Sequence, residues 1–212
     1  MYEPPLHREG DLVRQHALIK ARPLGLLVSH GPQGLIANAV PFRLDPALSK
    51  YGVLQAHVAR ANPQWRDLAV INEALVVFQG VDHYVSPSWY ATKQETHKVV
   101  PTWNYVMVQA RGPVRVIEDD AWIERQIAAL TARQEAAREA PWAVSDAPAD
   151  FIALQRKAIV GIEIEIADIR GKWKTSQNRN AADRAGVVEG LEALGDEEAL
   201  AMAAIVREKE AG

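Results

Sequence analysis

The pattern that most constrains the fold is an alternation of branched apolar and acidic side chains after residue 159. The even positions carry Val160, Ile162, Ile164 and Ile166, whereas Glu163 and Glu165 occupy odd positions. Successive side chains of a strand point to opposite faces of its sheet, so this segment predicts a strand with one buried and one solvated face. Such strands are typical of antiparallel sheets, since parallel sheets are usually covered on both faces.

Further strands are predicted along the chain, mostly as neighbours joined by short turns. They are Gly25–Ser29, Leu35–Phe42, Tyr51–Val58, Ala74–Phe78, His83–Ser86 and Asn104–Ile117. The segment from His30 to Gly34 reads as the glycine-rich turn of a hairpin. The long strand should bend at Gly112-Pro113, because proline cannot donate a ladder hydrogen bond. A change of parity at Ala167-Asp168 predicts a bulge.

Helical patterns lie between and after the strands. We expect helices over Leu12–Lys20, from Asn62-Pro63 to Ile71, after a cap at Asp119-Asp120, and over Ala149–Lys157, Ala181–Leu194 and Glu197–Glu210. This order favours a mainly β, α+β fold with an antiparallel sheet or barrel and peripheral helices, rather than a doubly wound parallel sheet. We predict one domain over residues 1–178 and a helical extension over residues 179–212.

Composition excludes several classes of site. The 212 residues include no cysteine, which excludes disulfides, thiolate zinc sites, iron–sulfur clusters and cysteine nucleophiles. A net charge of −3 argues against a broad surface for nucleic acid or anionic membrane. The chain has no GxxxxGK[ST], GxGxxG or GxSxG motif, and its six histidines never fall at HExxH or HxH spacing, so no metal site is expected. It also lacks an apolar signal core or a run near about 18 residues, and we expect a soluble cytoplasmic protein.

Three polar or aromatic segments are candidates for a binding site. The first, His57–Trp65, is a strand end leading into a helix start, where free backbone N–H groups and Arg60 could hold an anion. The second comprises Tyr84–Tyr90 and Val100–Tyr105, whose tryptophans, tyrosines and prolines suit a rigid pocket for a flat ligand. The third, Gly171–Arg179, offers three cations and several hydrogen-bond donors. By residue type alone, a capped helix explains the first segment as well as an anion site does. A self-packed loop and a polar strand end explain the second and third segments better than a binding site does.

Taken in order, these segments resemble the PaiB family, described as FMN-binding negative transcriptional regulators. The strings that carry the resemblance are Met1–Pro5, Asn38–Phe42, His57–Trp65, Val77–Gly80, Ser86–Tyr90, Val100–Tyr105 and Lys172–Asn178. They span nearly the whole chain, and NPQW, SPSWY and VPTWNY are specific in combination. The nine residues Ala91–Val99 between the last two strings depart from the shortest spacing.

The resemblance implies an antiparallel split β-barrel, similar to pyridoxamine-phosphate-oxidase-like proteins. Such domains usually form homodimers that hold FMN at the subunit interface. By analogy, the cofactor-binding residues are Asn38, Val40, His57, Arg60, Asn62, Gln79, Thr102, Trp103, Lys172, Ser176, Gln177 and Asn178. Within this set the loop after the third strand, with His57, Arg60 and Asn62, would bind the flavin phosphate. Asn38 and Val40 would lie beside the isoalloxazine ring.

Three functions follow as hypotheses. The first is an FMN-binding negative regulator that acts without a recognisable DNA-binding helix, so that direct DNA binding is doubtful. The alternative is a flavin-dependent oxidoreductase or flavin reductase, in which His57 or His83 could donate protons. A haem-handling split barrel is an outside possibility, although no histidine sits in an obvious haem-ligand motif. No catalytic residue is assigned.

Overall fold

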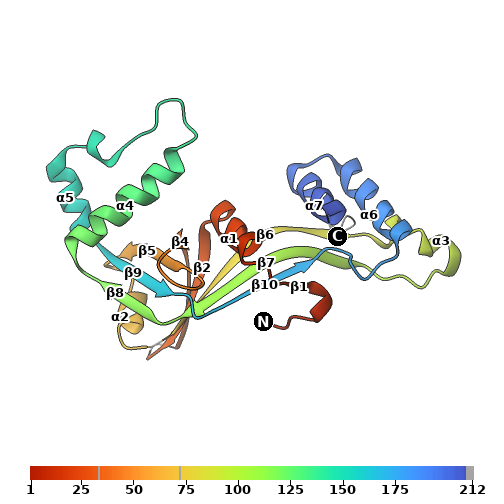
Figure 1. Cartoon of the computed structure of the whole chain (residues 1–212), viewed down its shortest axis with the longest axis horizontal. Helices are drawn as coiled ribbons and strands as arrows, with labels where there is room; N and C mark the ends of the chain where they lie inside the picture. The colour runs from red at the N-terminus through yellow and green to blue at the C-terminus, as the bar shows by residue number, and fades with distance from the viewer. Residues whose placement is uncertain (33, 72, 209–212) are drawn as a thin grey trace. The chain divides into compact units, whose positions relative to one another are not determined.

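A computed structural model describes residues 1–32, 34–71 and 73–208 (Figure 1). It confirms the predicted class, antiparallel sheets with peripheral helices. The described residues fall into two compact units. The first unit comprises residues 1–15, 79–108 and those from 170 onward, and the second comprises residues 16–78 and 109–169. Gln33 of the predicted turn and Lys209 and Glu210 of the last predicted helix lie outside the described residues.

The second unit contains a four-stranded antiparallel sheet in the order β4-β5-β9-β8. Its strands are β4 (Arg43–Asp45), β5 (Val53–Ala59), β8 (Val114–Ile117) and β9 (Ile159–Glu165). The helices of this unit are α2 (Gln64–Leu68), α4 (Asp120–Glu135) and α5 (Ala149–Lys157). Figure 1 shows α4 and α5 beside each other near the strands β8 and β9. The alternating segment is β9, with Ile162 and Ile164 fully buried and Glu163 partly exposed as predicted.

A hairpin completes the second unit. Strands β2 (Leu24–Gly31) and β3 (Gly34–Pro41) pair antiparallel, and β2 also pairs with the start of β6 (Ala74–Val85). The inner face of the hairpin buries Leu27, and nearby Phe42 and Phe78 meet edge to face with their ring centroids 5.9 Å apart.

The first unit is built on strands in the order β1-β10-β7-β6. The strands not yet named are β1 (Arg8–Glu9), β7 (Thr102–Gly112) and β10 (Asp168–Lys174). Its short helical turns are η1 (Pro5–His7), η2 (Pro87–Trp89) and α3 (Thr92–Thr96). The longer helices α6 (Ala181–Leu194) and α7 (Glu197–Glu208) pack side by side (Figure 1), and α1 (Leu12–Ala21) begins in this unit and continues into the second.

Three local predictions need correction. Helix α2 spans only Gln64–Leu68. It starts at Gln64 because the Asn62 side chain accepts a hydrogen bond from the Gln64 N–H and forms a turn before the helix. The segments predicted as Ala74–Phe78 and His83–Ser86 form one strand, β6. In place of a bulge, β9 ends at Glu165 and β10 starts at Asp168, so the chain leaves one sheet and enters the other.

The predicted bend at Gly112-Pro113 is confirmed, and it divides the long strand into β7 and β8 in different sheets. Gly112 is required there, since a Cβ atom would lie 1.8 Å from the carbonyl oxygen of Glu165. The chain therefore changes sheet at a point where only glycine fits.

Candidate functional site

The residues predicted to bind the cofactor divide between the two units. The second unit holds Asn38, Val40, His57, Arg60 and Asn62. The first unit holds Gln79, Thr102, Trp103, Lys172, Ser176, Gln177 and Asn178. Each group is described by itself.

In the second unit, Asn38 belongs to a buried polar cluster that sequence analysis did not identify. Its Nδ2 donates to Gln64 Oε1 at 2.9 Å. Gln64 is fully buried, and its own amide donates to the Leu27 carbonyl at 3.1 Å and to Ser29 Oγ at 3.0 Å. Val40, at 3% exposure, is a core residue. Gln64 lies within the NPQW string, which was the available signal for it.

The other side chains of this group are held by protein contacts. Arg60 donates from Nη1 to Glu118 at 2.5 Å, and its remaining guanidinium nitrogens reach the carbonyl oxygens of residues 157 and 159. Asn62 accepts from the backbone of α2, and His57 Nδ1 lies 2.8 Å from Gln126 Oε1. The Arg60 guanidinium is thus already neutralised by a carboxylate. The roles of these residues in flavin binding stay predictions.

The first unit brings together most of its predicted residues around the end of β10. Lys174 donates from Nζ to Thr102 Oγ1 at 2.6 Å and also to the carbonyl oxygen of Trp103. Buried Ser176 and Asn104 are joined by two hydrogen bonds of 2.9 and 3.2 Å. Sequence analysis counted Lys174 among the three cations of the third segment but did not assign it to the cofactor. It missed Asn104, although this residue lies inside the VPTWNY string.

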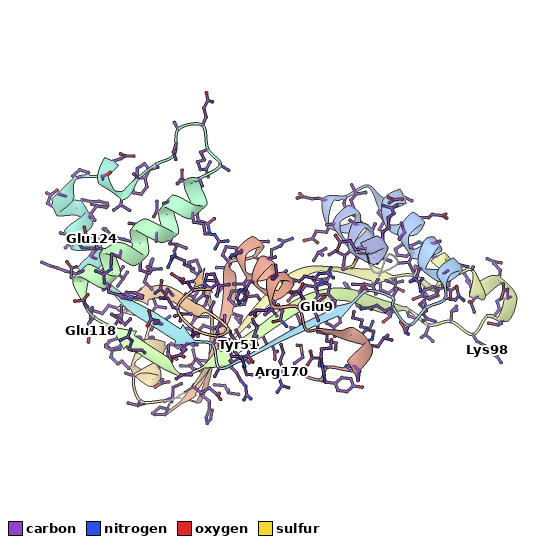
Figure 2. All side chains as sticks on the ribbon, in the orientation of Figure 1. Glu9, Tyr51, Lys98, Glu118, Glu124 and Arg170 are labelled. Carbon is purple, nitrogen blue, oxygen red and sulfur yellow. The ribbon has the colours of Figure 1, made fainter. Side chains whose placement is uncertain are left out.

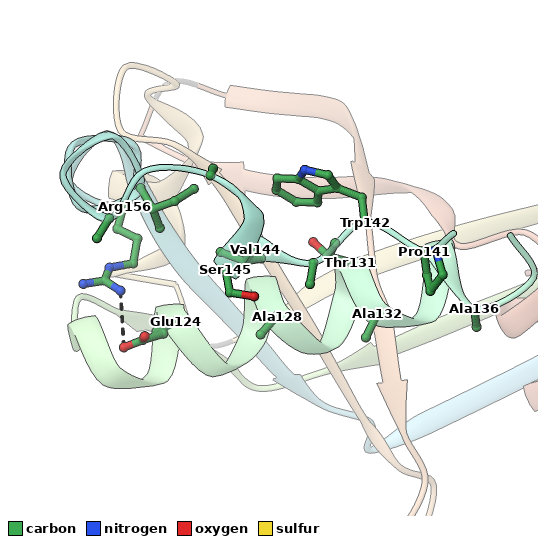
Figure 3. A pocket seen from close by; sticks show the side chains of 14 residues that line it. Glu124, Ala128, Thr131, Ala132, Ala136, Pro141, Trp142, Val144, Ser145 and Arg156 are labelled. Atoms are coloured by element: carbon green, nitrogen blue, oxygen red, sulfur yellow. Dashed lines mark ion pairs between the residues drawn. The ribbon is translucent and has the colours of Figure 1, made fainter. Parts of the chain in front are cut away.

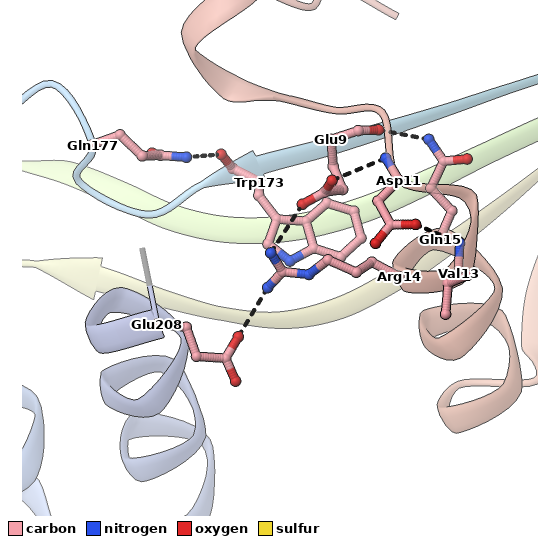
Figure 4. A network of polar contacts seen from close by, with 8 residues as sticks. All are labelled: Glu9, Asp11, Val13, Arg14, Gln15, Trp173, Gln177 and Glu208. Carbon is pink, nitrogen blue, oxygen red and sulfur yellow. Dashed lines mark hydrogen bonds and ion pairs between the residues drawn. The ribbon is translucent and has the colours of Figure 1, made fainter. Parts of the chain in front are cut away.

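Gln177 ties this segment to the N-terminal residues. Its Oε1 accepts from the Thr175 N–H at 2.7 Å and from His7 Nδ1 at 3.2 Å, and its Nε2 donates to the Trp173 carbonyl (Figure 4). Figure 4 also shows Arg14 between Glu9 and Glu208, a separate ion-pair network of the same unit. Gln79 lies outside this arrangement, since its amide donates to Asp82 at 2.8 Å. Asn178 is exposed.

Three cations of the first unit lie close together, and we call Lys172, Lys174 and Arg179 the cationic cluster. Lys172 is only 7% exposed, with Nζ 5.2 Å from the centre of the Tyr105 ring and 5.5 Å from that of Tyr2. Arg179 stacks on Tyr90 at 4.3 Å. Among the described residues, none of the three forms an ion pair with a carboxylate.

The titration of neighbouring groups reflects this excess of positive charge. Burial, reinforced by the charges of Lys172 and Arg179, lowers the pKa of Lys174 below its ordinary value. Burial also lowers the pKa of His7, and Lys174 and Lys172 lower it further against the opposing effect of its bond to Gln177. The cationic cluster is therefore a site where an anion would be stabilised.

Two more features suit a ligand at this place. Thr175 is fully buried, and its Oγ1 has no hydrogen-bond partner within the protein as described. Trp103, whose carbonyl Lys174 binds, is 53% exposed, and its ring meets that of Tyr84 edge to face at 5.9 Å. FMN combines a phosphate, hydroxyl groups and a flat ring. Cations, an unpartnered hydroxyl and exposed aromatic rings are therefore groups that fit it.

The connector between SPSWY and VPTWNY is ordered by a buried carboxylate. Asp183 of α6 accepts from the Thr92 N–H at 2.8 Å and from its Oγ1 at 2.9 Å, which fixes the start of α3. In the described parts of the chain, no group of three or more acidic or histidine side chains is placed to hold a metal. Nor does any helix there have the length and apolar character needed to cross a bilayer.

Comparisons with known proteins identify the family. A family model described as "Putative FMN-binding domain" matches residues 1–168. A protein of Emericella nidulans is 36% identical, over 99% of this chain and 97% of its own. Protease synthase and sporulation protein PAI 2 of Bacillus subtilis is 29% identical, over 99% of this chain and 98% of its own.

Solved structures with a similar fold were also found. The FAD and haem binding protein of Mycobacterium smegmatis superposes with a TM-score of 0.61 at 18% identity, covering 84% of this chain and 79% of its own. At this identity the similarity shows the fold alone. The predicted split barrel is confirmed.

Proposed function

This chain belongs to the family of FMN-binding domains, and on that premise we propose that the cationic cluster holds the phosphate of FMN. The observation that carries the proposal is the set of three cations that have no carboxylate partner among the described residues. Burial lowers the pKa of Lys174, and the charges of Lys172 and Arg179 lower it further. A phosphate between them would relieve their mutual repulsion. Trp103, exposed beside Lys174, then offers a surface on which the flavin ring stacks.

Hydrogen bonds from the cationic cluster to the phosphate would contribute enough free energy to determine the affinity for FMN. A hydrogen bond to a charged group contributes about 1.5–3 kcal/mol, so each cation that contacts the phosphate is worth about ten- to a hundredfold in affinity. Bound FMN supplies the capacity for electron transfer, while the protein binds and orients it. Lys172 is fixed between two tyrosine rings, which reduces the conformational entropy lost on binding.

The test is a titration of the full chain with FMN, following quenching of flavin fluorescence, after an absorption spectrum and a mass measurement have identified any cofactor that copurifies. We expect Lys172→Met and Lys174→Met each to weaken FMN binding by at least about tenfold. The affinity for riboflavin, which has no phosphate, should fall much less. Lys98→Met is the matched control, because Lys98 is an exposed lysine of the loop after α3 (Figure 2). Equal losses for FMN and riboflavin would contradict phosphate binding at this cluster.

We further propose that this PaiB-type protein is cytoplasmic and acts as a negative transcriptional regulator through a partner protein, without direct contact to DNA. The net charge of −3 supports this, because nonspecific DNA affinity requires a positive surface. A gel-shift titration with the pure protein should give no sequence-dependent, salt-sensitive complex. Rapid reduction of bound flavin by NADH or NADPH would instead favour the oxidoreductase alternative.

We also propose a homodimer formed through the outer face of the β2–β3 hairpin. Leu24, Leu26 and Leu35 on this face are 62%, 43% and 77% exposed. Across the hairpin Leu24 pairs with Pro41 and Leu26 with Ala39, while Leu35 pairs with His30, so the face is apolar except for His30 near the turn. A second copy would bury the same face on both chains, as a two-fold interface requires.

A further inference from the structure

A large cavity in the second unit is lined by none of the residues predicted to bind flavin, although Arg156 at its edge also lines a smaller cavity with Arg60. We call the large cavity the α4–α5 pocket, and its volume is about 930 Å³, within the range of small-molecule sites. Figure 3 shows α4 along one side and the loop bearing Trp142 along the other. One side of the pocket is formed by short side chains at helical spacing, Ala128, Thr131, Ala132 and Ala136.

The loop that covers the pocket is held in place by its own hydrogen bonds. The Glu135 carboxylate at the end of α4 accepts from the Trp142 N–H at 3.3 Å and from Arg138 Nε at 3.0 Å. The Ala143 N–H donates to the Asp146 carboxylate at 2.8 Å. These contacts fix Trp142, 46% exposed, on the wall opposite the alanines, so the pocket exists before a ligand binds.

The polar end of the pocket is close to neutral and keeps one free donor. Arg156 of α5 forms ion pairs with Asp120 at 2.9 Å and Glu124 at 3.3 Å, and the pair with Glu124 is drawn in Figure 3. Its Nε is buried and has no hydrogen-bond partner among the described residues, so a ligand acceptor reaches it only after a small shift of the Arg156 side chain. Two carboxylates around one guanidinium disfavour a second anion, whereas a neutral oxygen or ring nitrogen can accept the Nε–H.

We propose that the α4–α5 pocket binds an uncharged, planar aromatic molecule that carries one hydrogen-bond acceptor. The short side chains of α4 leave a shallow, even surface, and Trp142 supplies an aromatic wall. Arg156 Nε selects for the acceptor. The ligand differs from FMN in lacking the phosphate, and the residues that line the pocket all belong to the second unit, whereas the cationic cluster belongs to the first.

Two naphthalene probes test the proposal on the full chain. Prodan is neutral and carries a ketone acceptor, and N-phenyl-1-naphthylamine is neutral without a carbonyl. We expect prodan to bind one site per chain with a blue-shifted emission. Ala132→Phe, which fills the pocket, should weaken the binding of both probes at least about tenfold. The matched control is Ala201→Phe, the same change at an exposed alanine of α7, and it should leave both affinities unchanged.

Arg156→Met separates the hydrogen bond from simple apolar capture. This substitution should lower the affinity for prodan several-fold and leave the affinity for N-phenyl-1-naphthylamine unchanged. The proposal is overturned if Ala132→Phe leaves prodan binding unaffected, or if no probe binds. It is also overturned if FMN displaces prodan, which would make the pocket part of the flavin site. A change of oligomeric mass in Ala132→Phe would show a contact between copies and overturn it as well.

Discussion

Ser176 stores backbone strain at the centre of the candidate site, and two substitutions separate that strain from its hydrogen bonds. Its φ of +64° is a left-handed conformation that costs a non-glycine residue about 1–2 kcal/mol. Its hydroxyl meanwhile satisfies Asn104, which is completely buried. Ser176→Ala keeps the strain and leaves the Asn104 amide without its partner, a loss of about 1–3 kcal/mol. Ser176→Gly loses the same bond but relieves the strain.

We therefore expect Ser176→Gly to be more stable than Ser176→Ala by about 1 kcal/mol, the reverse of the order found at an ordinary β position. In thermal unfolding this is a difference of about 2–4 °C, with Ser176→Ala melting about 4–8 °C below the parent for a loss of about 2 kcal/mol. Urea unfolding of the same proteins gives the free energies directly. Equal stability of the two variants, or a less stable glycine variant, would refute the strain argument.

The same pair examines the predicted contact between Ser176 and FMN. If the hydroxyl touches the cofactor, both variants lose affinity equally, because both lack it. If Ser176 instead only sets the backbone path through the site, both variants retain the FMN affinity of the parent, because both keep that path. Flavin fluorescence titration distinguishes these outcomes without any assay of turnover.

Three further predictions concern other parts of the chain. Gly190→Ala should lower the free energy of unfolding by about 1–2 kcal/mol despite the better helix propensity of alanine, since its Cβ would lie 2.3 Å from the Trp89 ring. Gly10→Ala is the control: its Cβ would meet no described atom within 4 Å beyond its chain neighbours, so it should leave the free energy of unfolding unchanged in the same urea titration. FMN affinity should fall as pH rises from the lowered pKa of Lys174 towards 10.5, because binding the anion requires Lys174 to be protonated. The free energy of unfolding without FMN should rise over the same interval, since the unfolded chain binds the proton more tightly than the folded protein does. A flat pH profile in both experiments would contradict the role of Lys174 in phosphate binding. Leu26→Glu should weaken the dimer at least about a hundredfold by sedimentation, and a monomeric parent protein would exclude that interface.

Several predictions from sequence are confirmed because they rest on local rules. Helices α5 and α6 have the predicted bounds, and α4 begins after Asp119, whose carboxylate accepts from the Trp122 N–H at 2.7 Å. The resemblance to PaiB-type proteins and FMN as the cofactor are confirmed by the family match and the relatives. Capping, alternation and short strings of residues are properties of neighbouring positions, so the sequence expresses them directly.

Other features depend on contacts across long stretches of chain. Arg60 was expected to be available for a phosphate, yet Glu118, 58 residues later, neutralises its guanidinium. Burial and the neighbouring charges of Lys172 and Arg179 lower the pKa of Lys174. The α4–α5 pocket exists because the loop bearing Trp142 lies over α4. The type of a residue determines neither which side chain it forms an ion pair with nor whether a loop forms a pocket beside it.

The sequence by itself therefore determined most of the strands and helices, the bend of the long strand at Gly112-Pro113, and which strings mark a flavin-binding family. Only the tertiary structure decided which cations remain without carboxylate partners, since an ion pair forms or fails according to distance in space. That distinction separates Arg60, engaged by Glu118, from Lys172, buried between two tyrosines and free to meet an anion.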